Sequence, residues 1–334
     1  MQSTGGSMFK ALVLDQVDGK TRSEIRQLEE TDLPEGEVLV DVAYSSLNYK
    51  DGLAVTGKGK IISAFPAIPG IDFVGKVASS ADARFSAGDE VILTGWGVGE
   101  RHWGGMAEKA RVKADWLVPL PSGMSARTSM LIGTAGLTAM LCVLGLEKGG
   151  VTPDQGPVLV TGASGGVGSV AVALLAKRGF EVVAATGRTS EEAYLRKLGA
   201  SEIRSRDEMA ATPRPLEKQR WAGVVDTVGG TVLARAIAET LYSGTVTACG
   251  LAGSHDLPVT VMPFILRNVR LQGVDSVSCP VPVRTEAWQR LQSDLDVELL
   301  GDLGQEIELE QVPDYAERIL RGEVRGRTLI KLSS

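Results

Sequence analysis

The stretch Val158-Leu-Val-Thr-Gly-Ala-Ser-Gly-Gly-Val-Gly168 decides the fold of the second half of this chain. A short apolar run, residues 158–161, leads into glycines three residues apart and then into a helix-like run, residues 169–177. Glycines at such a turn let the backbone approach a pyrophosphate, whose charge is stabilised at the positive end of the following helix. Glycine-rich turns also occur without a ligand, but the strand before this one and the helix after it favour a dinucleotide site. The residues predicted to hold its phosphates are Ser164, Gly165, Gly166 and Val167.

The end of the next predicted strand distinguishes between the two nicotinamide coenzymes. An NAD site usually carries Asp or Glu about 20 residues after the glycines, where the carboxylate accepts a hydrogen bond from the ribose. Here the strand Val182–Thr186 is followed by Gly187 and Arg188. Arginine cannot accept that hydrogen bond, but it can pair with a 2′-phosphate. We therefore expect NADPH, with Thr186, Gly187 and Arg188 around the 2′-phosphate, and Arg206 either as a second phosphate ligand or as a solvated surface residue.

Composition sets outer limits on the function. The chain has 334 residues, enough for two domains that each bury a core. It carries 35 Lys and Arg against 41 Asp and Glu, a net charge of −6, and has no long basic run. Nucleic acid and anionic membrane surfaces are therefore not expected as partners.

Cysteine usage and the apolar segments indicate a cytoplasmic protein. The three cysteines, Cys142, Cys249 and Cys279, are far apart and odd in number, which is typical of a reducing compartment. The longest apolar segments, such as residues 138–146, are short and interrupted for a bilayer span. Residues 1–7 have no apolar core, and we interpret them as a leader placed ahead of Met8 rather than as a targeting signal.

The pattern of predicted secondary structure changes near residue 129. Before it, short β-like runs separated by Gly and Pro predict a barrel-like domain, with strands at 9–14, 38–42, 73–77, 90–93 and 108–112. After it, strand and helix patterns alternate, which is typical of a parallel sheet, with strands at 158–161, 182–186, 223–226, 245–249 and 271–275. We predict an α/β protein with a barrel domain over residues 8–128, completed by 296–334, and a doubly wound domain over 129–295.

Two common catalytic devices are not encoded. A zinc dehydrogenase needs Cys and His ligands, but the chain has only two histidines, no Cys-x-x-Cys spacing, and Ile71-Asp72 where a ligand pair would be expected. The short-chain reductases use a tyrosine with a lysine four residues later, and none of the five tyrosines here has one. The chemistry predicted for this chain therefore uses neither device.

Several motifs resemble one known family. They are Ser46-Leu-Asn-Tyr-Lys-Asp51, Pro69-Gly-Ile-Asp-Phe-Val-Gly75, Gly88-Asp-Glu-Val91 and the glycine turn from Thr161 to Gly168. Together they resemble the zinc-free branch of the medium-chain dehydrogenase/reductase superfamily, over the whole chain from Met8. Two longer strings, residues 93–105 and 263–276, are similar to a subgroup long labelled quinone oxidoreductases, which includes the NADPH-dependent acrylyl-CoA reductases.

The resemblance implies a fold and a reaction. The fold would be a GroES-like β barrel followed by a Rossmann domain, with the tail rejoining the barrel and the active site in the cleft between them. The reaction would be the NADPH-dependent reduction of the double bond of acryloyl-CoA to propanoyl-CoA, by hydride addition at the β-carbon and protonation at the α-carbon. Because the thioester already makes the β-carbon electrophilic, no metal is implied.

By the same resemblance, the catalytic residues would be Tyr49 and Asn48. They lie where zinc-dependent relatives keep a metal ligand and a proton relay, and Asp51 is expected to be structural. Tyr49 is expected to contact the nicotinamide ribose or the substrate carbonyl, and either Tyr49 or water would supply the proton. The competing interpretation of Tyr49 is a core tyrosine whose hydroxyl is satisfied internally.

Residues near the predicted strand ends complete the expected coenzyme site. Leu251 follows a strand whose carboxyl end faces the ligand edge of the sheet, and it is expected to form an apolar wall beside the adenosine ribose or the nicotinamide. Ile265 and Ser276, in the second long string, would contact the nicotinamide end. His102 is either catalytic or an anchor of its loop, and the candidates for the CoA phosphates are Lys58, Lys60, Arg325 and Arg327.

Two other functions stay open at this point. One is the reduction of free quinones or enones without a CoA pocket, and the other is NADPH binding without catalysis. We also expect a homodimer, because the last strand of the predicted sheet, residues 271–276, would leave an unpaired edge that a second copy can cover.

Overall fold

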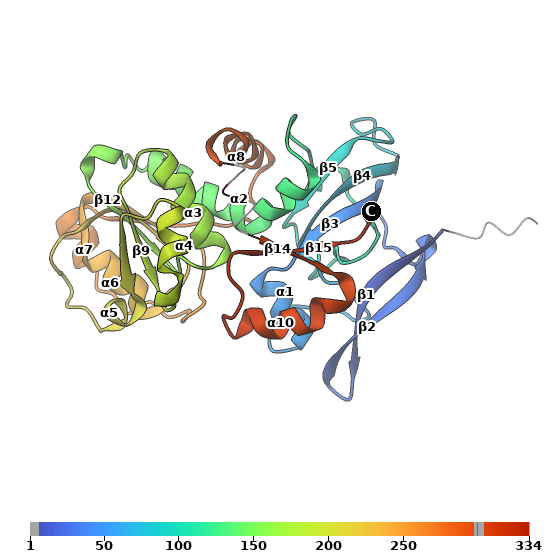
Figure 1. The fold of residues 1–334 in the computed structure, drawn as a ribbon, viewed down its shortest axis with the longest axis horizontal. Coiled ribbons are helices and arrows are strands. Elements are labelled where there is room, and N and C mark those ends of the chain that lie inside the picture. The colour runs from blue at the N-terminus through green and yellow to red at the C-terminus, as the bar shows by residue number, and fades with distance from the viewer. Residues whose placement is uncertain (1–6, 297–298, 300–303, 334) are drawn as a thin grey trace, which may run out of the picture. The chain divides into compact units, whose positions relative to one another are not determined.

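The chain folds into two compact units in a computed structural model, which describes residues 7–296, 299 and 304–333 (Figure 1). One unit comprises Met1–Thr134 with Asp302–Ser334, and the other comprises Ala135–Gly301. Residues 1–6 of the expected leader, and residues 297–298, 300–303 and 334 of the expected tail, lie outside the described residues.

The first unit is built on β-strands. A hairpin of β1 (Met8–Val17) and β2 (Lys20–Glu29) lies beside a seven-stranded sheet whose order is β14-β15-β3-β4-β5-β7, with β6 paired to β3. The bounds of these strands are β3 Val38–Ser46, β4 Asp72–Ser80, β5 Glu90–Thr94, β6 Lys109–Val112, β7 Leu117–Pro119, β14 Gly304–Glu308 and β15 Arg327–Lys331. All five predicted strands of this unit are present. The sequence did not predict β2, because its Lys, Arg, Glu and Ser residues show no apolar alternation and none of its residues is buried.

The C-terminal tail belongs to the first unit. Strand β15 pairs antiparallel with β3, with Leu329 opposite Ser46, and β14 pairs in parallel with β15. Helix α10 (Val312–Leu320) packs against α1 (Tyr49–Thr56), and Figure 1 shows the two helices side by side. The pairing places a strand that ends the sequence directly beside the strand that leads into α1.

The second unit is a doubly wound sheet. Its six parallel strands have the order β10-β9-β8-β11-β12-β13, and helices cover both faces of the sheet (Figure 1). The strands are β8 Val158–Thr161, β9 Val182–Thr186, β10 Glu202–Ser205, β11 Trp221–Asp226, β12 Thr240–Ala248 and β13 Arg270–Gly273. The five predicted strands are confirmed, with shifted ends. Strand β10 was missed because its sequence, Glu-Ile-Arg-Ser, carries one apolar residue on an edge strand.

The helices of the second unit connect successive strands. They are α3 Gly166–Lys177, α4 Glu192–Lys197, α5 Arg206–Ala210, α6 Gly230–Ala238, α7 Met262–Arg267 and α8 Val281–Asp294. Because every strand is parallel, the carboxyl ends of all six lie at one edge of the sheet, where open α/β folds bind ligands. The glycine turn lies at that edge, between β8 and α3.

Helix α2 (Ala126–Lys148) is longer than the sequence suggested. Its 23 residues are apolar enough to cross a membrane by length and composition, which corrects the prediction that the apolar segments are too short. The most apolar part of α2 is completely buried in the protein, however, and a buried core helix meets the same criterion. The helix is interrupted at Gly133, whose φ of +51° and ψ of −158° are not helical.

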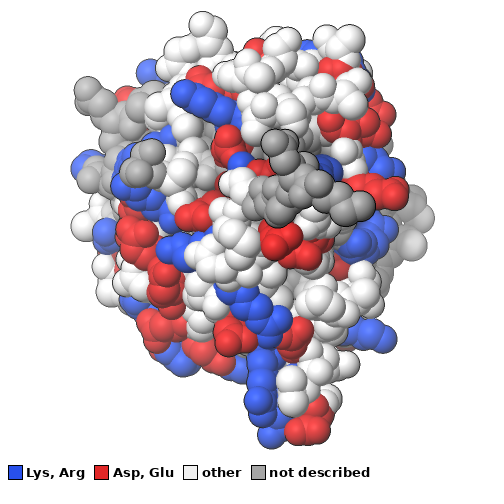
Figure 2. All heavy atoms as spheres, turned by 90° about the vertical axis from the view of Figure 1, so that its right-hand side faces the viewer, with Lys and Arg blue, Asp and Glu red and all other residues white. Residues whose placement is uncertain are grey.

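Opposite charges are interspersed on the face shown in Figure 2. In the first unit several of these opposite charges form ion pairs. Lys109 lies 3.1 Å from Glu30 and 2.7 Å from Asp41, and Arg84 lies 2.7 Å from both Asp82 and Asp115. Exposed pairs of this kind contribute at most about 1 kcal/mol each to stability. They neutralise charge locally instead of building a patch of one sign.

Candidate coenzyme and active site

The glycine turn brings backbone N–H groups to the carboxyl edge of the second unit. Gly162 has a φ of +59°, which an L side chain rarely adopts, and Gly165 donates a backbone hydrogen bond of 2.9 Å to its carbonyl. At Gly168 an added Cβ would lie 2.7 Å from the Cα of Ala163, so the first turn of α3 packs tightly against the loop. The first N–H groups of α3 have no acceptor within the helix, and they therefore form a site for an anionic group.

A polar cluster stands beside this turn at the end of β9. The hydroxyls of Ser164 and Thr186 are 2.9 Å apart, and the backbone N–H of Arg188 donates to the Thr186 hydroxyl at 3.0 Å. One guanidinium nitrogen of Arg188 donates to both the carbonyl and the hydroxyl of Ser164, each at 3.1 Å. We call Ser164, Thr186, Arg188 and Arg206 the arginine cluster.

Arg206 joins this cluster from the next strand. It is the first residue of α5, directly after β10, and β10 pairs in parallel with β9. A Cβ added at Gly187 would lie 3.0 Å from the guanidinium carbon of Arg206, so this side chain lies over Gly187. The residue types fit a phosphate monoester, because the cluster offers two guanidinium groups and two hydroxyls as hydrogen-bond donors.

A buried aspartate connects the loops that follow β8 and β11. Asp226 accepts hydrogen bonds from the Thr161 hydroxyl at 2.7 Å and from the Gly229 N–H at 2.8 Å. The backbone N–H of Thr227 donates to the same Thr161 hydroxyl at 3.1 Å. Burial raises the pKa of Asp226, and these hydrogen bonds oppose the rise. The effect is to fix the two central loops of the carboxyl edge relative to each other.

A hollow of about 500 Å³ lies at the ends of β12 and β13. Its lining is formed by Ala248, Cys249, Gly250, Leu251, Gly273, Val274 and Asp275. Leu251 is 66% exposed, as expected for an apolar wall that a ligand can cover, and Ser276 directly follows the lining segment. Ile265, by contrast, lies exposed on α7 and is not part of this lining.

In the first unit, Tyr49 begins α1 and Asn48 precedes it as the N-cap residue. Tyr49 is 46% exposed, so its ring is not part of a closed core. Asn48 is buried, and its amide is engaged within the protein: Nδ2 donates to Asp72 at 3.0 Å, and Oδ1 accepts from Arg327 at 3.1 Å. Tyr49 is therefore partly exposed at the start of α1, whereas the side chain of Asn48 is buried and held by hydrogen bonds.

Asp72 and Arg327 form the centre of a buried polar network. Asp72 accepts from the N–H and hydroxyl of Ser46, at 3.1 and 2.7 Å, and from the N–H of Thr134 at 2.8 Å. Arg327 donates to Ser46 at 2.6 Å and to the Leu131 carbonyl at 3.0 Å. Both oxygens of Asp72 and all three nitrogens of the Arg327 guanidinium thus have partners.

This network corrects one prediction. Arg327 was a candidate for the CoA phosphates, but it is only 3% exposed and its guanidinium is used inside the unit. Of the other candidates, Lys58 forms an ion pair with Glu317 at 2.5 Å, while Lys60 and Arg325 are exposed. Because β15 pairs with β3, Arg327 lies near the start of α1 and is buried, although it is close to the end of the chain.

Asp51 and His102 have structural partners. Asp51 accepts from the backbone N–H groups of Asn48 at 2.9 Å and of Gly70 and Ile71 at 3.1 Å each. Burial and the neighbouring Asp72 raise the pKa of Asp51 to about 7, against the opposing effect of these donors. His102 Nε2 lies 2.8 Å from the Arg111 carbonyl, and burial lowers its pKa, which supports the interpretation of His102 as a loop anchor.

The sequence did not reveal three of these roles. Arg327 was predicted only as a candidate for the CoA phosphates and Asp226 only as the end of a strand, because nothing in their neighbours along the chain indicates the contacts that they make. Arg284 was not singled out at all, although it is completely buried in α8. A charged residue inside an amphipathic helix is usually solvated, so only the packing could identify it.

Comparison with known proteins places these features in context. The alcohol dehydrogenase GroES-like domain family matches residues 34–122, and the zinc-binding dehydrogenase family matches residues 166–293. The chain is 60% identical to an Escherichia coli protein named "probable acrylyl-CoA reductase AcuI", over 97% of this chain and all of that protein. It is 51% identical to the acrylyl-CoA reductase AcuI of Ruegeria pomeroyi, over 98% of this chain and all of that protein.

Among solved structures, the yhdH oxidoreductase of Salmonella enterica in complex with NADP superposes with a TM-score of 0.96. Its sequence is 61% identical, and the match covers 97% of this chain and all of that one. The similarity therefore extends over both units.

Proposed function

The chain belongs to the medium-chain dehydrogenase/reductase superfamily, in the group that includes the acrylyl-CoA reductases, and we propose that it reduces the carbon–carbon double bond of acryloyl-CoA to propanoyl-CoA with NADPH. The observation that carries the coenzyme assignment is the arginine cluster, where the Arg188 guanidinium binds Ser164 and the Arg206 guanidinium lies over Gly187. The relatives named acrylyl-CoA reductases support the substrate.

The second unit offers residues for each part of the coenzyme. Ser164, Gly165, Gly166 and Val167 would hold the pyrophosphate at the start of α3, where N–H groups and the helix dipole favour negative charge. Thr186, Gly187, Arg188 and Arg206 would hold the 2′-phosphate. Leu251 and Ser276 would contact the nicotinamide end in the hollow beside β12, and Ile265 stays a predicted contact that this hollow does not include.

When bound, NADPH supplies a hydride, which in the proposed reaction goes to the β-carbon of the acyl group. The protein then has to orient the alkene and stabilise the negative charge that develops on the thioester oxygen. We assign this role to Tyr49, whose hydroxyl can donate to that oxygen and whose ring is exposed at the start of α1. Either Tyr49 or water then delivers the proton to the α-carbon.

Asn48 is proposed to act on the reaction through Tyr49. Its side chain joins Asp72 to Arg327, so the N-cap of α1 is held from two sides. This donor set does not suit a divalent metal, because the Arg327 cation lies beside Asp72 and both carboxylate oxygens are occupied by protein donors. We therefore propose a reaction without a metal, in which the thioester provides the activation that zinc provides elsewhere in the superfamily.

The test is steady-state oxidation of NADPH with three acceptors: acryloyl-CoA, free acrylate and a benzoquinone. We expect turnover of acryloyl-CoA to exceed that of the other two by at least a hundredfold in kcat/KM, and Tyr49→Phe to lower kcat by at least tenfold. Comparable turnover of the quinone would replace this proposal with a quinone or enone reductase. Tight NADPH binding without turnover of any acceptor would indicate a non-catalytic protein.

We also propose a homodimer in the cytoplasm. Strand β13 is an edge strand, and large apolar residues are exposed on it and in the segment that leads into it: Leu257, Val261, Met262, Ile265, Leu266 and Leu271. Pairing of β13 with the same strand of a second copy would satisfy its free backbone edge and cover this apolar surface at once. Light scattering is expected to give twice the monomer mass of 35.2 kDa, and Leu271→Arg is expected to give a monomer.

A further inference from the structure

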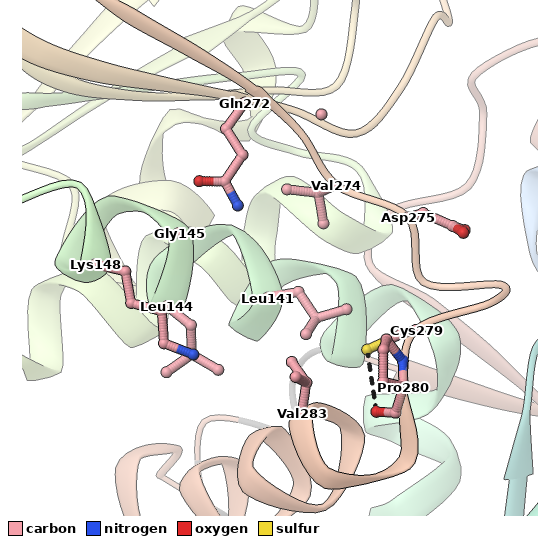
Figure 3. A pocket seen from close by; sticks show the side chains of 11 residues that line it. Leu141, Leu144, Gly145, Lys148, Gln272, Val274, Asp275, Cys279, Pro280 and Val283 are labelled. Carbon is pink, nitrogen blue, oxygen red and sulfur yellow. Dashed lines mark hydrogen bonds between the residues drawn. The ribbon is translucent and has the colours of Figure 1, made fainter.

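One wall of the proposed nicotinamide hollow also borders a second cavity. Gly273, Val274 and Asp275 line the 500 Å³ hollow together with Leu251. The same three residues also line a second cavity of about 200 Å³, whose other side is formed by Leu141 and Leu144 of α2 and by Val283 of α8 (Figure 3). Gly273, Val274 and Asp275 therefore border two cavities.

The sheet holds this segment only at its start. The N–H of Val274 donates to the Ala248 carbonyl at 2.9 Å, which is the last bond that continues the β12–β13 ladder. Beyond it the chain leaves the sheet and reaches α8 at Val281. In between, the Asp275 carboxylate accepts from the N–H of Val277 at 2.7 Å and from that of Ser278 at 3.2 Å, which closes a local turn.

Arg284 holds the other end of this turn. It lies one turn into α8, and one guanidinium nitrogen donates to the carbonyls of Ser276, Val277 and Cys279, at 3.1, 3.2 and 3.3 Å. The side chain is fully buried. Three of the four residues from Ser276 to Cys279 are thus attached to one side chain of α8.

Burying a cation at this place lowers the stability of the protein unless the cation forms compensating interactions. Desolvation disfavours the charged form of Arg284, and the start of a helix is the end at which the dipole also disfavours a cation. An apolar side chain of similar length would pack in the same helix without either cost. The carbonyl contacts provide the physical reason for an arginine here, because a single guanidinium can satisfy several carbonyls of an irregular loop.

We propose that Arg284 is a positioning residue for the nicotinamide end of the coenzyme: it holds the 276–279 loop and thereby fixes the wall at 273–275 against which that end binds. The inference rests on the proposed function, because it assumes that the hollow beside Leu251 receives the nicotinamide. It adds a residue that touches neither coenzyme nor substrate and acts through the backbone of the loop.

Binding measurements on the full-length protein separate the two ends of the coenzyme. Adenosine 2′,5′-bisphosphate carries the 2′-phosphate but no nicotinamide, so it probes the arginine cluster alone, whereas NADPH probes both ends. Calorimetry is used to compare the wild type with Arg284→Lys and Arg284→Gln. The matched control is Arg267→Lys, since Arg267 also donates to two backbone carbonyls of this unit, those of Ala238 and Glu217, each at 2.7 Å.

We expect both Arg284 variants to bind NADPH at least tenfold more weakly than the wild type and to bind the bisphosphate within twofold of it. Arg267→Lys is expected to bind both ligands within twofold. Unchanged NADPH affinity in folded Arg284 variants overturns the inference, and so does an equal loss for both ligands. If the wild type itself fails to bind NADPH and the bisphosphate, the proposed function fails instead. A thermal shift induced by the bisphosphate verifies that each variant is folded.

Discussion

Removal of Arg188 tests whether the arginine cluster selects NADPH. In Arg188→Ala the 2′-phosphate would lose a charge-assisted hydrogen bond, and bonds of that type contribute about 1.5–3 kcal/mol. At about 1.4 kcal/mol for each factor of ten, the dissociation constant for NADPH should rise by about tenfold to about a hundredfold. NADH has no 2′-phosphate, so its dissociation constant should change by less than about threefold.

Arg188 also braces the glycine turn, and the experiment has to separate that role from the phosphate contact. Its guanidinium donates to the Ser164 carbonyl and hydroxyl, so its loss can loosen the turn that both coenzymes share. Loosening of the turn weakens NADPH and NADH equally. The informative quantity is therefore the ratio of the two dissociation constants, measured by calorimetry on the same preparation.

The matched control is Arg196→Ala in the same unit. Arg196 is exposed and forms an ion pair with Glu192 at 2.8 Å, so its removal takes away the same charge at a distance from the cluster. It should leave the NADPH to NADH ratio within about twofold. An Arg188→Ala protein with an unchanged ratio would refute the assignment of the cluster to the 2′-phosphate, whatever its absolute affinities.

Three further predictions concern Asp51, Asp72 and Gly168. Because burial raises the pKa of Asp51 from 3.8 to about 7, the folded state favours the protonated acid, and stability falls as the pH rises through this interval. Urea unfolding should show that the wild type loses about 2–3 kcal/mol between pH 5 and pH 8 relative to Asp51→Asn; parallel pH profiles would contradict this. Asp72→Asn removes a buried charge beside Arg327 and should lower the free energy of unfolding by about 3 kcal/mol in the same assay. The control, Asp41→Asn, removes the exposed pair with Lys109 and should lower it by less than about 1 kcal/mol. Equal losses of stability in the two variants would argue against the network. Gly168→Ala places a Cβ against Ala163, so it should abolish binding of both NADPH and NADH. Circular dichroism should show that the variant is folded. Normal NADPH affinity would contradict the close packing of the turn.

The coenzyme assignment could be predicted because its signals are local. The strand, the glycine turn and the first turn of α3 occupy eleven consecutive residues, and the choice of NADPH depended on which residues follow the next strand. Periodicity and glycine spacing act over such short distances, so the alternation of strands and helices was also recoverable from the chain alone. Strands β2, β7, β10 and β14 were missed, and of these β2 and β10 are polar and carry no apolar period to detect.

Other parts of the site depend on contacts between distant segments, and these only the tertiary structure decided. Arg327 meets Asn48 across 279 residues because β15 pairs with β3, and this pairing converted an expected surface cation into a buried one. Arg206 reaches Gly187 because β10 lies beside β9, and Arg284 reaches the 276–279 loop because α8 folds back on it. The sequence alone does not show whether an arginine is surrounded by water or hydrogen-bonded to three carbonyls. Sequence alone therefore determined that this chain presents a phosphate-binding turn with a basic residue after the next strand, while packing decided which of its arginines face a ligand and which hold the protein around it.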